Sequence, residues 1–204
     1  VFKQMGADYV VEGGQSMNPS AEDFVKGFNS LNAENIIVFP NNSNIVLTAQ
    51  QAAKYYEKAN VIVVPSKTLA QGYSALTMLD LSSGDVEEIV EGIKDVISNV
   101  TTGLITYSIR DTEIEEVTIK QGDYIGICNG KIVTSNADRI DSVKKLLEHS
   151  DIAEKEIITI IVGKDAPKEE VEAVKAHINE TYPNVEIDEV TGDQDIYSYI
   201  FSIE

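Results

Sequence analysis

Two short runs of consecutive apolar residues constrain the fold of this chain most strongly. Ile36–Phe39 and Val61–Val64 are each followed by a polar loop and then by a helical pattern. A strand that is apolar at every position is typical of a sheet covered on both faces, because alternate side chains point to opposite faces. Strand–loop–helix units of this kind build parallel sheets. We therefore expect a small parallel βα subdomain over residues 1–80, with one more short strand at Ala7–Val11.

The pattern changes after residue 80. Asp85–Asn99 predicts an amphipathic helix, and closely spaced strand signals follow it at Thr102–Arg110, Glu113–Lys120, Tyr124–Cys128 and Lys131–Thr134. Asn129-Gly130 joins the last two of these strands and is a strong signal for a two-residue hairpin. Helices and strands then alternate to a last strand at Tyr197–Ile203. Residues 81–204 are thus expected to form an α+β subdomain with a mixed sheet, which makes the whole chain α/β.

The charge of the chain is strongly acidic and unevenly distributed. Asp and Glu number 34 against 16 Lys and Arg, which gives a formal net charge of −18. Residues 1–80 hold five basic and seven acidic residues, whereas residues 81–204 hold eleven basic and twenty-seven acidic ones. Nucleic acid and anionic membranes would repel such a surface. The excess is consistent either with solubility alone or with a docking face for a basic partner.

Few residues are suited to metal binding or to nucleophilic catalysis. Cys128 is the single cysteine, which excludes an internal disulfide and favours a reducing, cytoplasmic compartment. His149 and His177 lie near the ends of two different predicted helices, where a histidine commonly caps the helix. One Cys and two scattered His cannot build a closed zinc site. The acidic run at 111–116 alternates along a strand, so we expect a solvated acidic face and no metal.

Nothing in the sequence indicates a membrane span or a secretory leader. The longest apolar runs are far too short to cross a bilayer. No basic-then-apolar segment of the signal-peptide type opens the chain. The chain begins at Val1, close to a strand-like segment, and we interpret it as part of a longer protein.

Three polar loops fall where a strand ends and a helix begins. They are Gln15–Ser20, Asn41–Asn44 and Ser66–Thr68. The carboxyl ends of parallel strands are where ligands usually bind, and helix N-termini there suit an anion. Ser, Asn and Thr are also the ordinary helix-capping residues, so both interpretations stay open. The candidate contacts of an anion or lipid head group are Ser16, Asn18, Asn41, Asn42, Ser66 and Thr68.

These loops carry a resemblance to a known family. The order of elements resembles the DegV-like fatty-acid-binding fold over almost all of the chain. Several stretches resemble more closely the C-terminal region of the fatty acid kinase A subunit, also called the YloV family, a fusion with a dihydroxyacetone-kinase-type domain. They are Glu12–Ser20, Phe39–Asn44, Val64–Gly72 and Thr106–Thr112. The hairpin Asn129-Gly130-Lys131-Ile132-Val133 resembles one found in the DegV-like family.

The departures from the lipid-binding members of this fold are informative. In those proteins a Thr-Ser pair holds the fatty acid carboxylate, whereas Gly13-Gly14 stand near that place here and offer no hydroxyl. The late His-x-Gly-Pro-Gly segment of the family corresponds to Gly192–Ile196, which has no His and two acids. Carboxylates beside an anionic head group would repel it. We infer a related fold whose head-group site is lost, with Ser16, Ser66 and Thr68 as remaining anion contacts.

The resemblance implies a non-catalytic module of a larger bacterial enzyme. ATP and Mg²⁺ would bind only in an upstream kinase domain, which a middle domain joins to this chain. The enzyme would phosphorylate a fatty acid held by a separate basic B subunit, giving acyl-phosphate for phospholipid synthesis. This chain would need no cofactor and would dock the lipid-loaded B subunit through an acidic face. The candidate acids are Asp85, Glu87, Glu88, Glu91, Asp111, Glu113, Asp193 and Asp195.

Two alternatives belong to other functional classes. A lipid-binding protein would still carry a fatty acid between its two halves, which the complete fold layout and the retained polar loops favour. An independent enzyme would need a nucleophile with its base or a metal-binding set, and the sequence offers neither.

Overall fold

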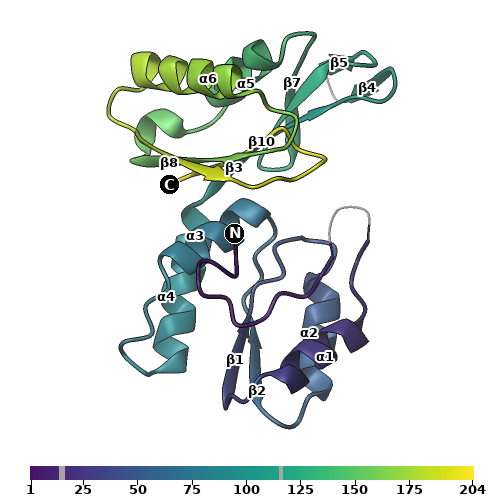
Figure 1. Cartoon of the computed structure of the whole chain (residues 1–204), viewed down its shortest axis with the longest axis vertical. Helices are drawn as coiled ribbons and strands as arrows, with labels where there is room; N and C mark the ends of the chain where they lie inside the picture. The colour runs from purple at the N-terminus through teal and green to yellow at the C-terminus, as the bar shows by residue number, and fades with distance from the viewer. Residues whose placement is uncertain (14–16, 115–116) are drawn as a thin grey trace. The chain divides into compact units, whose positions relative to one another are not determined.

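The computed structural model describes residues 1–13, 17–114 and 117–204. Two compact units make up the chain, Val1–Asn99 and Val100–Glu204, and Figure 1 shows the elements of each. Within the described ranges, no helix is both long enough and apolar enough to cross a bilayer.

In its described residues, 1–13 and 17–99, the first unit contains a two-stranded parallel sheet and four helices. Asn35 pairs with Asn60 at one end of the sheet, and Val38 pairs with Val63 at the other. The elements are α1 (Ala21–Ser30), β1 (Asn35–Val38), α2 (Val46–Tyr55), β2 (Asn60–Val63), α3 (Leu69–Thr77) and α4 (Val86–Asn99). The two apolar runs of the sequence are therefore parallel strands, as predicted.

Helices cover both faces of this sheet, α1 and α2 on one side and α3 and α4 on the other (Figure 1). Ile36 and Val61 contribute to the cluster with the first pair of helices, which is centred on Phe24 and Phe28. Ile37 and Ile62 contribute to the opposite cluster. Successive strand residues thus enter different cores, which explains why the paired strand interiors are apolar.

The sequence suggests a boundary between subdomains after residue 80, which would assign α4 to the second subdomain. In the structure α4 packs inside the first unit instead. Its apolar side chains Val90, Ile93 and Ile97 form one cluster with Val64 and Ala75. The amphipathic pattern of this helix is satisfied by the sheet of the first unit, so the helix belongs to that unit.

The strand predicted at Ala7–Val11 is wrong. This segment has no strand pairing in the described chain and instead lies against α1. A Cβ on Gly27 would lie 3.0 Å from the Tyr9 ring, so the glycine allows the ring to approach the helix closely. Val11 joins the α1–α2 cluster beside it. Ser20 and Asp23 form a capping box at the start of α1.

The second unit is an α+β layer built on a six-stranded mixed sheet. The strand order is β7-β6-β3-β10-β8-β9, and β8 with β9 is its parallel pair. The elements are β3 (Thr101–Tyr107), β4 (Thr112–Ile114), β5 (Val117–Ile119), β6 (Tyr124–Cys128), β7 (Lys131–Asn136), α5 (Arg139–Glu148), the 3-10 turn η1 (Ile152–Glu154), β8 (Ile157–Val162), α6 (Lys168–Thr181), β9 (Glu186–Thr191) and β10 (Tyr199–Ile203).

Local turn chemistry fixes two features of this unit. Asn129 and Gly130 have φ values of 46° and 83°, as a two-residue hairpin between β6 and β7 requires. The single strand predicted at Glu113–Lys120 is wrong, because the segment forms two short antiparallel strands, β4 and β5. Residues 115 and 116, which join them, lie outside the described residues.

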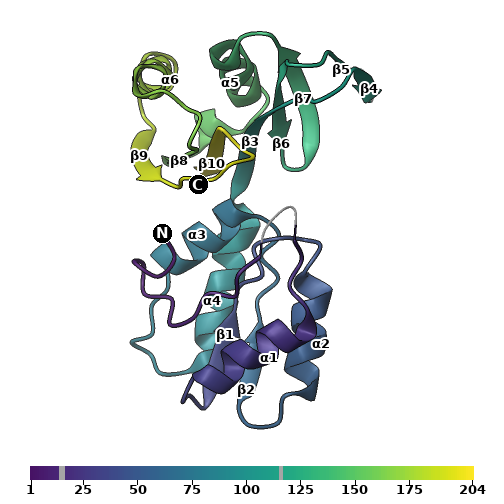
Figure 2. The same ribbon diagram turned by 45° about the vertical axis from the view of Figure 1, so that its right-hand side comes forward.

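Both helices of the second unit lie on the same face of the six-stranded sheet (Figure 2). Leu146 of α5 and Val174 of α6 are fully buried against the central strands, where Tyr199 and Phe201 of β10 stack with ring centroids 5.8 Å apart. This is the core of the unit.

Arg139 joins α5, α6 and β10 through a buried network of charges. Its guanidinium donates to Glu170 at 2.6 Å and to Asp165 at 2.6 Å, and it lies 5.0 Å from the centroid of the Tyr124 ring. The side chain is only 8% exposed. Tyr199 donates to the same Glu170 carboxylate at 3.0 Å. The network satisfies a cation that would otherwise be costly to bury.

We expect Arg139→Ala to lower the free energy of unfolding by about 3–5 kcal/mol, because the change leaves Glu170 partly buried without its cation. Urea unfolding followed by circular dichroism measures this. Lys144→Ala is the control, since its pair with Asp141 is exposed and 3.7 Å long, and we expect it to change stability by less than ~0.5 kcal/mol. Equal effects of the two substitutions would contradict the structural role of Arg139.

Candidate functional site

Two of the three predicted polar loops interlock at the carboxyl ends of β1 and β2. The backbone N–H of Asn41 donates to the Ser66 hydroxyl at 3.0 Å, and that hydroxyl donates to the Asn41 side-chain oxygen at 2.7 Å. The N–H of Ser43 donates to the carbonyl of Lys67 at 3.1 Å. Asn41 has a φ of 59°, a left-handed conformation that asparagine tolerates. The structure therefore brings Asn41 and Ser66 together.

Several polar groups of these loops bond within the loops or to the start of α3. Ser66 is fully buried, and a Cβ on Gly72 would overlap the Asn41 carboxamide, so α3 packs directly on this side chain. Asn42 accepts from the N–H of Asn44 at 2.9 Å. Thr68 caps α3 by accepting from the N–H of Gln71 at 3.1 Å. Each of these groups has a structural partner, and a role in ligand binding stays a prediction.

The first polar loop is described only from Met17 onward. Asn18 is exposed ahead of α1. Ser16 lies outside the described residues.

Four of the predicted acids lie at the start of α4 and along its exposed face. Asp85 accepts from the N–H groups of Glu87 and Glu88 at 2.9 and 3.3 Å and so caps the helix. Glu91 pairs with Lys94 at 2.6 Å. Residues 80–95 contain six acidic side chains and one lysine. The resulting negative potential lies beside the positive end of the helix dipole, where first-turn carboxylates are favourable.

The other four predicted acids belong to the second unit. Asp111 accepts from the N–H of Gln121 at 2.7 Å, and Glu113 is exposed on β4. Asp193 is exposed with a φ of 54°. Asp195 forms an ion pair with Lys164 at 2.8 Å, which raises the pKa of that lysine. The structure brings Asp193 and Asp195 together on one turn.

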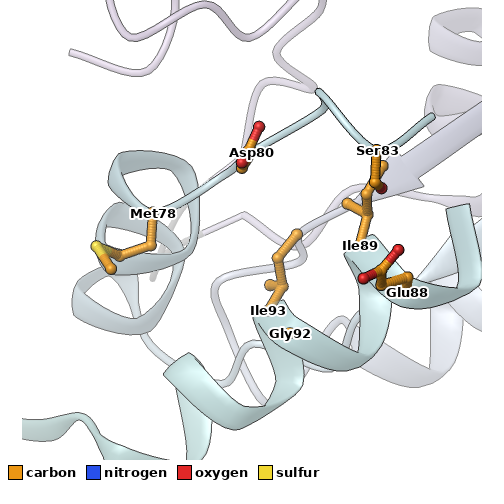
Figure 3. Close-up of a pocket in the computed structure, with 7 residues that line it drawn as sticks. All are labelled: Met78, Asp80, Ser83, Glu88, Ile89, Gly92 and Ile93. Atoms are coloured by element: carbon orange, nitrogen blue, oxygen red, sulfur yellow. The ribbon is translucent and has the colours of Figure 1, made fainter. Parts of the chain in front are cut away.

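A cleft of about 250 Å³ lies between the end of α3, the loop after it and α4 (Figure 3). Ile89 and Ile93 point from α4 toward the loop that carries Asp80 and Ser83 (Figure 3). Asp80 and Glu88 give the cleft two carboxylates. The N–H of Ser82 donates to Asp80 at 2.8 Å and lowers the pKa of that carboxyl, which holds it ionised. The lining residues are Met78, Asp80, Ser83, Glu88, Ile89, Gly92 and Ile93.

A second cleft, of about 220 Å³, lies at the other end of the same helix pair. Lys67 and Lys94 contribute its positive charge, although Lys94 is already paired with Glu91. Val64, Pro65 and Ile97 form its apolar wall. Ligand pockets for small molecules usually measure at least about 300 Å³, so each of the two clefts is smaller than a typical small-molecule site.

The surroundings of the two histidines and the cysteine are those of residues that cap a helix or pack in the interior. His149 caps α5, and its Nδ1 lies 2.8 Å from the carbonyl oxygen of Lys145. Burial lowers the pKa of His177, whose ring packs edge-on against Tyr182. Burial, with a smaller contribution from Asp151, raises the pKa of the Cys128 thiol, opposite to the change that a nucleophile needs. In the described ranges, no three His, Cys, Asp or Glu side chains gather closely enough to hold a metal ion.

Comparison with known families identifies the chain. A family model for the C-terminal region of proteins like the fatty acid kinase A subunit matches residues 1–204. The chain belongs to this family. Protein YloV of Bacillus subtilis strain 168 is 41% identical over all 204 residues, which make up 36% of that protein. An uncharacterized protein of Staphylococcus aureus strain USA300 is 39% identical over the whole chain, which corresponds to 37% of its length. The chain thus spans little more than a third of these relatives.

Solved structures confirm the DegV-like fold. A Thermotoga maritima protein described as having a fatty acid binding function superimposes with a TM-score of 0.65 at 15% identity, over 100% of this chain and 81% of that one. The fatty acid kinase B3 protein of Streptococcus pneumoniae, loaded with linoleic acid, gives 0.64 at 13% identity, over 91% and 76%. DegV of Bacillus subtilis, a fatty acid binding protein, gives 0.56 at 15%, over 92% and 78%.

The sequence-based reasoning missed the cleft beside the acidic residues of α4. Its lining comes from two helices and the loop between them, and only the folded unit brings Met78 close to Ile89 and Ile93. One local signal was available, because Gly92 interrupts an otherwise regular amphipathic helix, where glycine costs about 1 kcal/mol relative to alanine.

We expect Ser66→Ala to lower the free energy of unfolding by about 1–3 kcal/mol, because it leaves the N–H of Asn41 and its side-chain oxygen without their partner. Chemical denaturation measures the change. Ser43→Ala in the neighbouring exposed position is the control, with an expected change within about 0.5 kcal/mol. An unchanged stability of the Ser66 variant would show that the interlocked loops do not depend on this hydroxyl.

Proposed function

We propose that this chain is a non-catalytic docking module of a bacterial fatty acid kinase. It binds the basic, lipid-loaded fatty-acid-binding B subunit, so that the parent enzyme can phosphorylate the fatty acid to an acyl-phosphate for phospholipid synthesis. Family membership and the exposed acids of α4 support this proposal. The single observation that carries it is the acidic segment 80–95, in which carboxylates lie beside an apolar cleft.

Phosphoryl transfer is assigned to other parts of the parent protein in this proposal. The chain corresponds to little more than a third of its relatives, and its family is defined by the C-terminal region of the kinase. ATP and Mg²⁺ would bind in an upstream kinase domain, which a middle domain would join to this module. A carrier subunit must arrive and leave in every catalytic cycle, and charge complementarity speeds its arrival while keeping the complex reversible.

Charge reversal tests the docking role. The triple variant Glu87→Lys, Glu88→Lys and Glu91→Lys should weaken binding of the lipid-loaded B subunit by about tenfold or more at low ionic strength, because it replaces attraction by repulsion. The difference from wild type should shrink at about 0.5 M salt, where the screening length falls to a few ångströms. Analytical ultracentrifugation at the two salt concentrations measures both effects.

The control carries the same change of net charge on a helix of the second unit. Glu169→Lys, Glu172→Lys and Glu180→Lys alter three exposed acids of α6, and Glu172 forms an (i, i+3) pair with Lys175 just as Glu91 does with Lys94. We expect this variant to bind much more tightly than the α4 variant. Equal affinity of the two would mean that net charge alone governs association, and an unchanged affinity of both would exclude the proposed face. The double variant Asp193→Lys and Asp195→Lys tests the acidic turn of the second unit by the same measurement of affinity for the B subunit.

A second candidate function is that of a lipid carrier. The observation favouring it is the shared fold with proteins solved as fatty acid binders. Solvent extraction followed by mass spectrometry decides between the two functions, and the B subunit serves as positive control. We expect no stoichiometric fatty acid, because Ser66 and Asn41 bond to each other and Gly13 offers no hydroxyl. One fatty acid per chain would establish the carrier instead.

A further inference from the structure

The lining of the cleft between α3 and α4 includes a glycine that the packing of the unit does not require. Gly92 lies in the middle of α4, and a Cβ built there meets no atom within 4 Å. The glycine therefore serves no close contact inside the unit. Gly92 is exposed and lines the cleft, so a larger side chain at this position would occupy space at the cleft that is now open (Figure 3). Glycine at this position keeps the cleft open, at the usual cost to helix stability.

The surroundings of the cleft are apolar at the base and acidic at the rim. Ile93 is buried and Ile89 is half-buried, so the base is formed by branched aliphatic side chains. Met78 is 59% exposed at one wall, and Leu81 is 60% exposed in the adjoining loop. Met78 and Leu81 therefore add exposed apolar surface beside the cleft.

The charges at the rim define the chemistry of the occupant. Asp80 and Glu88 line the cleft, and Asp85 and Glu87 lie next to it in the sequence. Lys94 is the basic residue of the segment 80–95, and it is paired with Glu91. A lysine or arginine beside an apolar group would match this pattern. A second copy of the chain, with a net charge of −18, would bring carboxylates against carboxylates.

The size of the cleft indicates a side chain rather than a free ligand. Its volume of about 250 Å³ is below the range of about 300–1,000 Å³ that is usual for small-molecule pockets. A single large aliphatic or aromatic side chain, presented by a protein surface, suits such a volume. Interfaces commonly depend on one or two anchors of this kind at their centre.

We infer that the α3–α4 cleft receives an apolar anchor side chain of the fatty-acid-binding subunit, carried on a surface segment that also presents lysine or arginine to Asp80 and Glu88. This inference rests on the proposed docking function and makes it specific. The carboxylates steer the basic segment, and the apolar anchor fills the space above Gly92. The anchor supplies the part of the affinity that salt does not screen.

The test is to fill the cleft without disturbing the fold. Gly92→Leu places a side chain in the open space, and replacing a mid-helix glycine favours the helix, so the variant should unfold no more easily than wild type. We expect its affinity for the lipid-loaded B subunit to fall by about tenfold or more, both at low salt and at about 0.5 M salt. Gln50→Leu, which adds an exposed leucine on α2, is the matched control and should bind like wild type.

The outcomes separate this inference from the docking function. If Gly92→Leu binds the B subunit as tightly as wild type, the cleft is not the anchor site, although the docking function can still hold. If the wild-type chain fails to bind at either salt concentration, both the anchor site and the docking function are wrong. If Gly92→Leu and Gln50→Leu lower the affinity for the B subunit equally, the cleft is likewise not the anchor site. Should Gly92→Leu unfold more easily, Met78→Ser changes the exposed wall instead, and an unchanged affinity of that variant overturns the inference. Self-association of the wild type that Gly92→Leu abolishes would assign the cleft to a second copy and overturn the assignment to the B subunit.

Discussion

The first unit depends on the burial of β1 and β2 on both faces. Each strand has four residues, and alternate residues enter two separate helical layers. An interior position of such a strand cannot carry a polar side chain without burying it, so polar side chains are displaced to the strand ends. The interlocked Asn41 and Ser66 are the direct result, because the loops at the carboxyl ends must satisfy their own backbone groups. Because both faces of the sheet must be covered, α4 packs on one of them. The opposite side of α4, which carries the carboxylates, faces solvent.

In the second unit the helices are held on the sheet by a buried charge network as well as by apolar packing. Its sheet packs both helices on one face, and Arg139 at the start of α5 is buried where α5, α6 and β10 meet. Two carboxylates, a serine hydroxyl and an aromatic ring surround the guanidinium. Such a network adds less stability than an apolar core of equal volume would. It constrains the relative positions of its side chains more closely, because every buried donor needs a correctly placed acceptor. It therefore fixes how the two helices are placed on the sheet.

Much of this fold could be predicted from local sequence chemistry, whereas contacts between residues far apart in the sequence could not. The apolar runs and Asn129-Gly130 each act within a few residues, and both predictions are confirmed. The segment 7–11 was misread because its contact, Tyr9 on Gly27, joins distant residues. In α2 the buried positions are Ala49 and Ala52, whereas Leu47 and Tyr55 are 65% and 78% exposed, which a pattern based on large side chains does not predict. The acids of α4 were found from the sequence, but the cleft beside them needs α3, a loop and α4 in one place.

The similarity to lipid-binding proteins and the proposed role as a docking module are compatible, because a fold fixes where ligands can bind and not whether they do. Identities of 13–15% leave the backbone recognisable while almost every side chain can change. In this chain the Ser66 hydroxyl donates to the side-chain oxygen of Asn41 at the strand ends, which occupies one donor that a head group could use. The open glycine, which has no internal contact, lies instead beside the cleft of α4, whose lining includes Asp80 and Glu88. Residues that cost stability and serve no internal contact are best explained by a partner, and this favours the outer helix layer as the functional surface of the first unit.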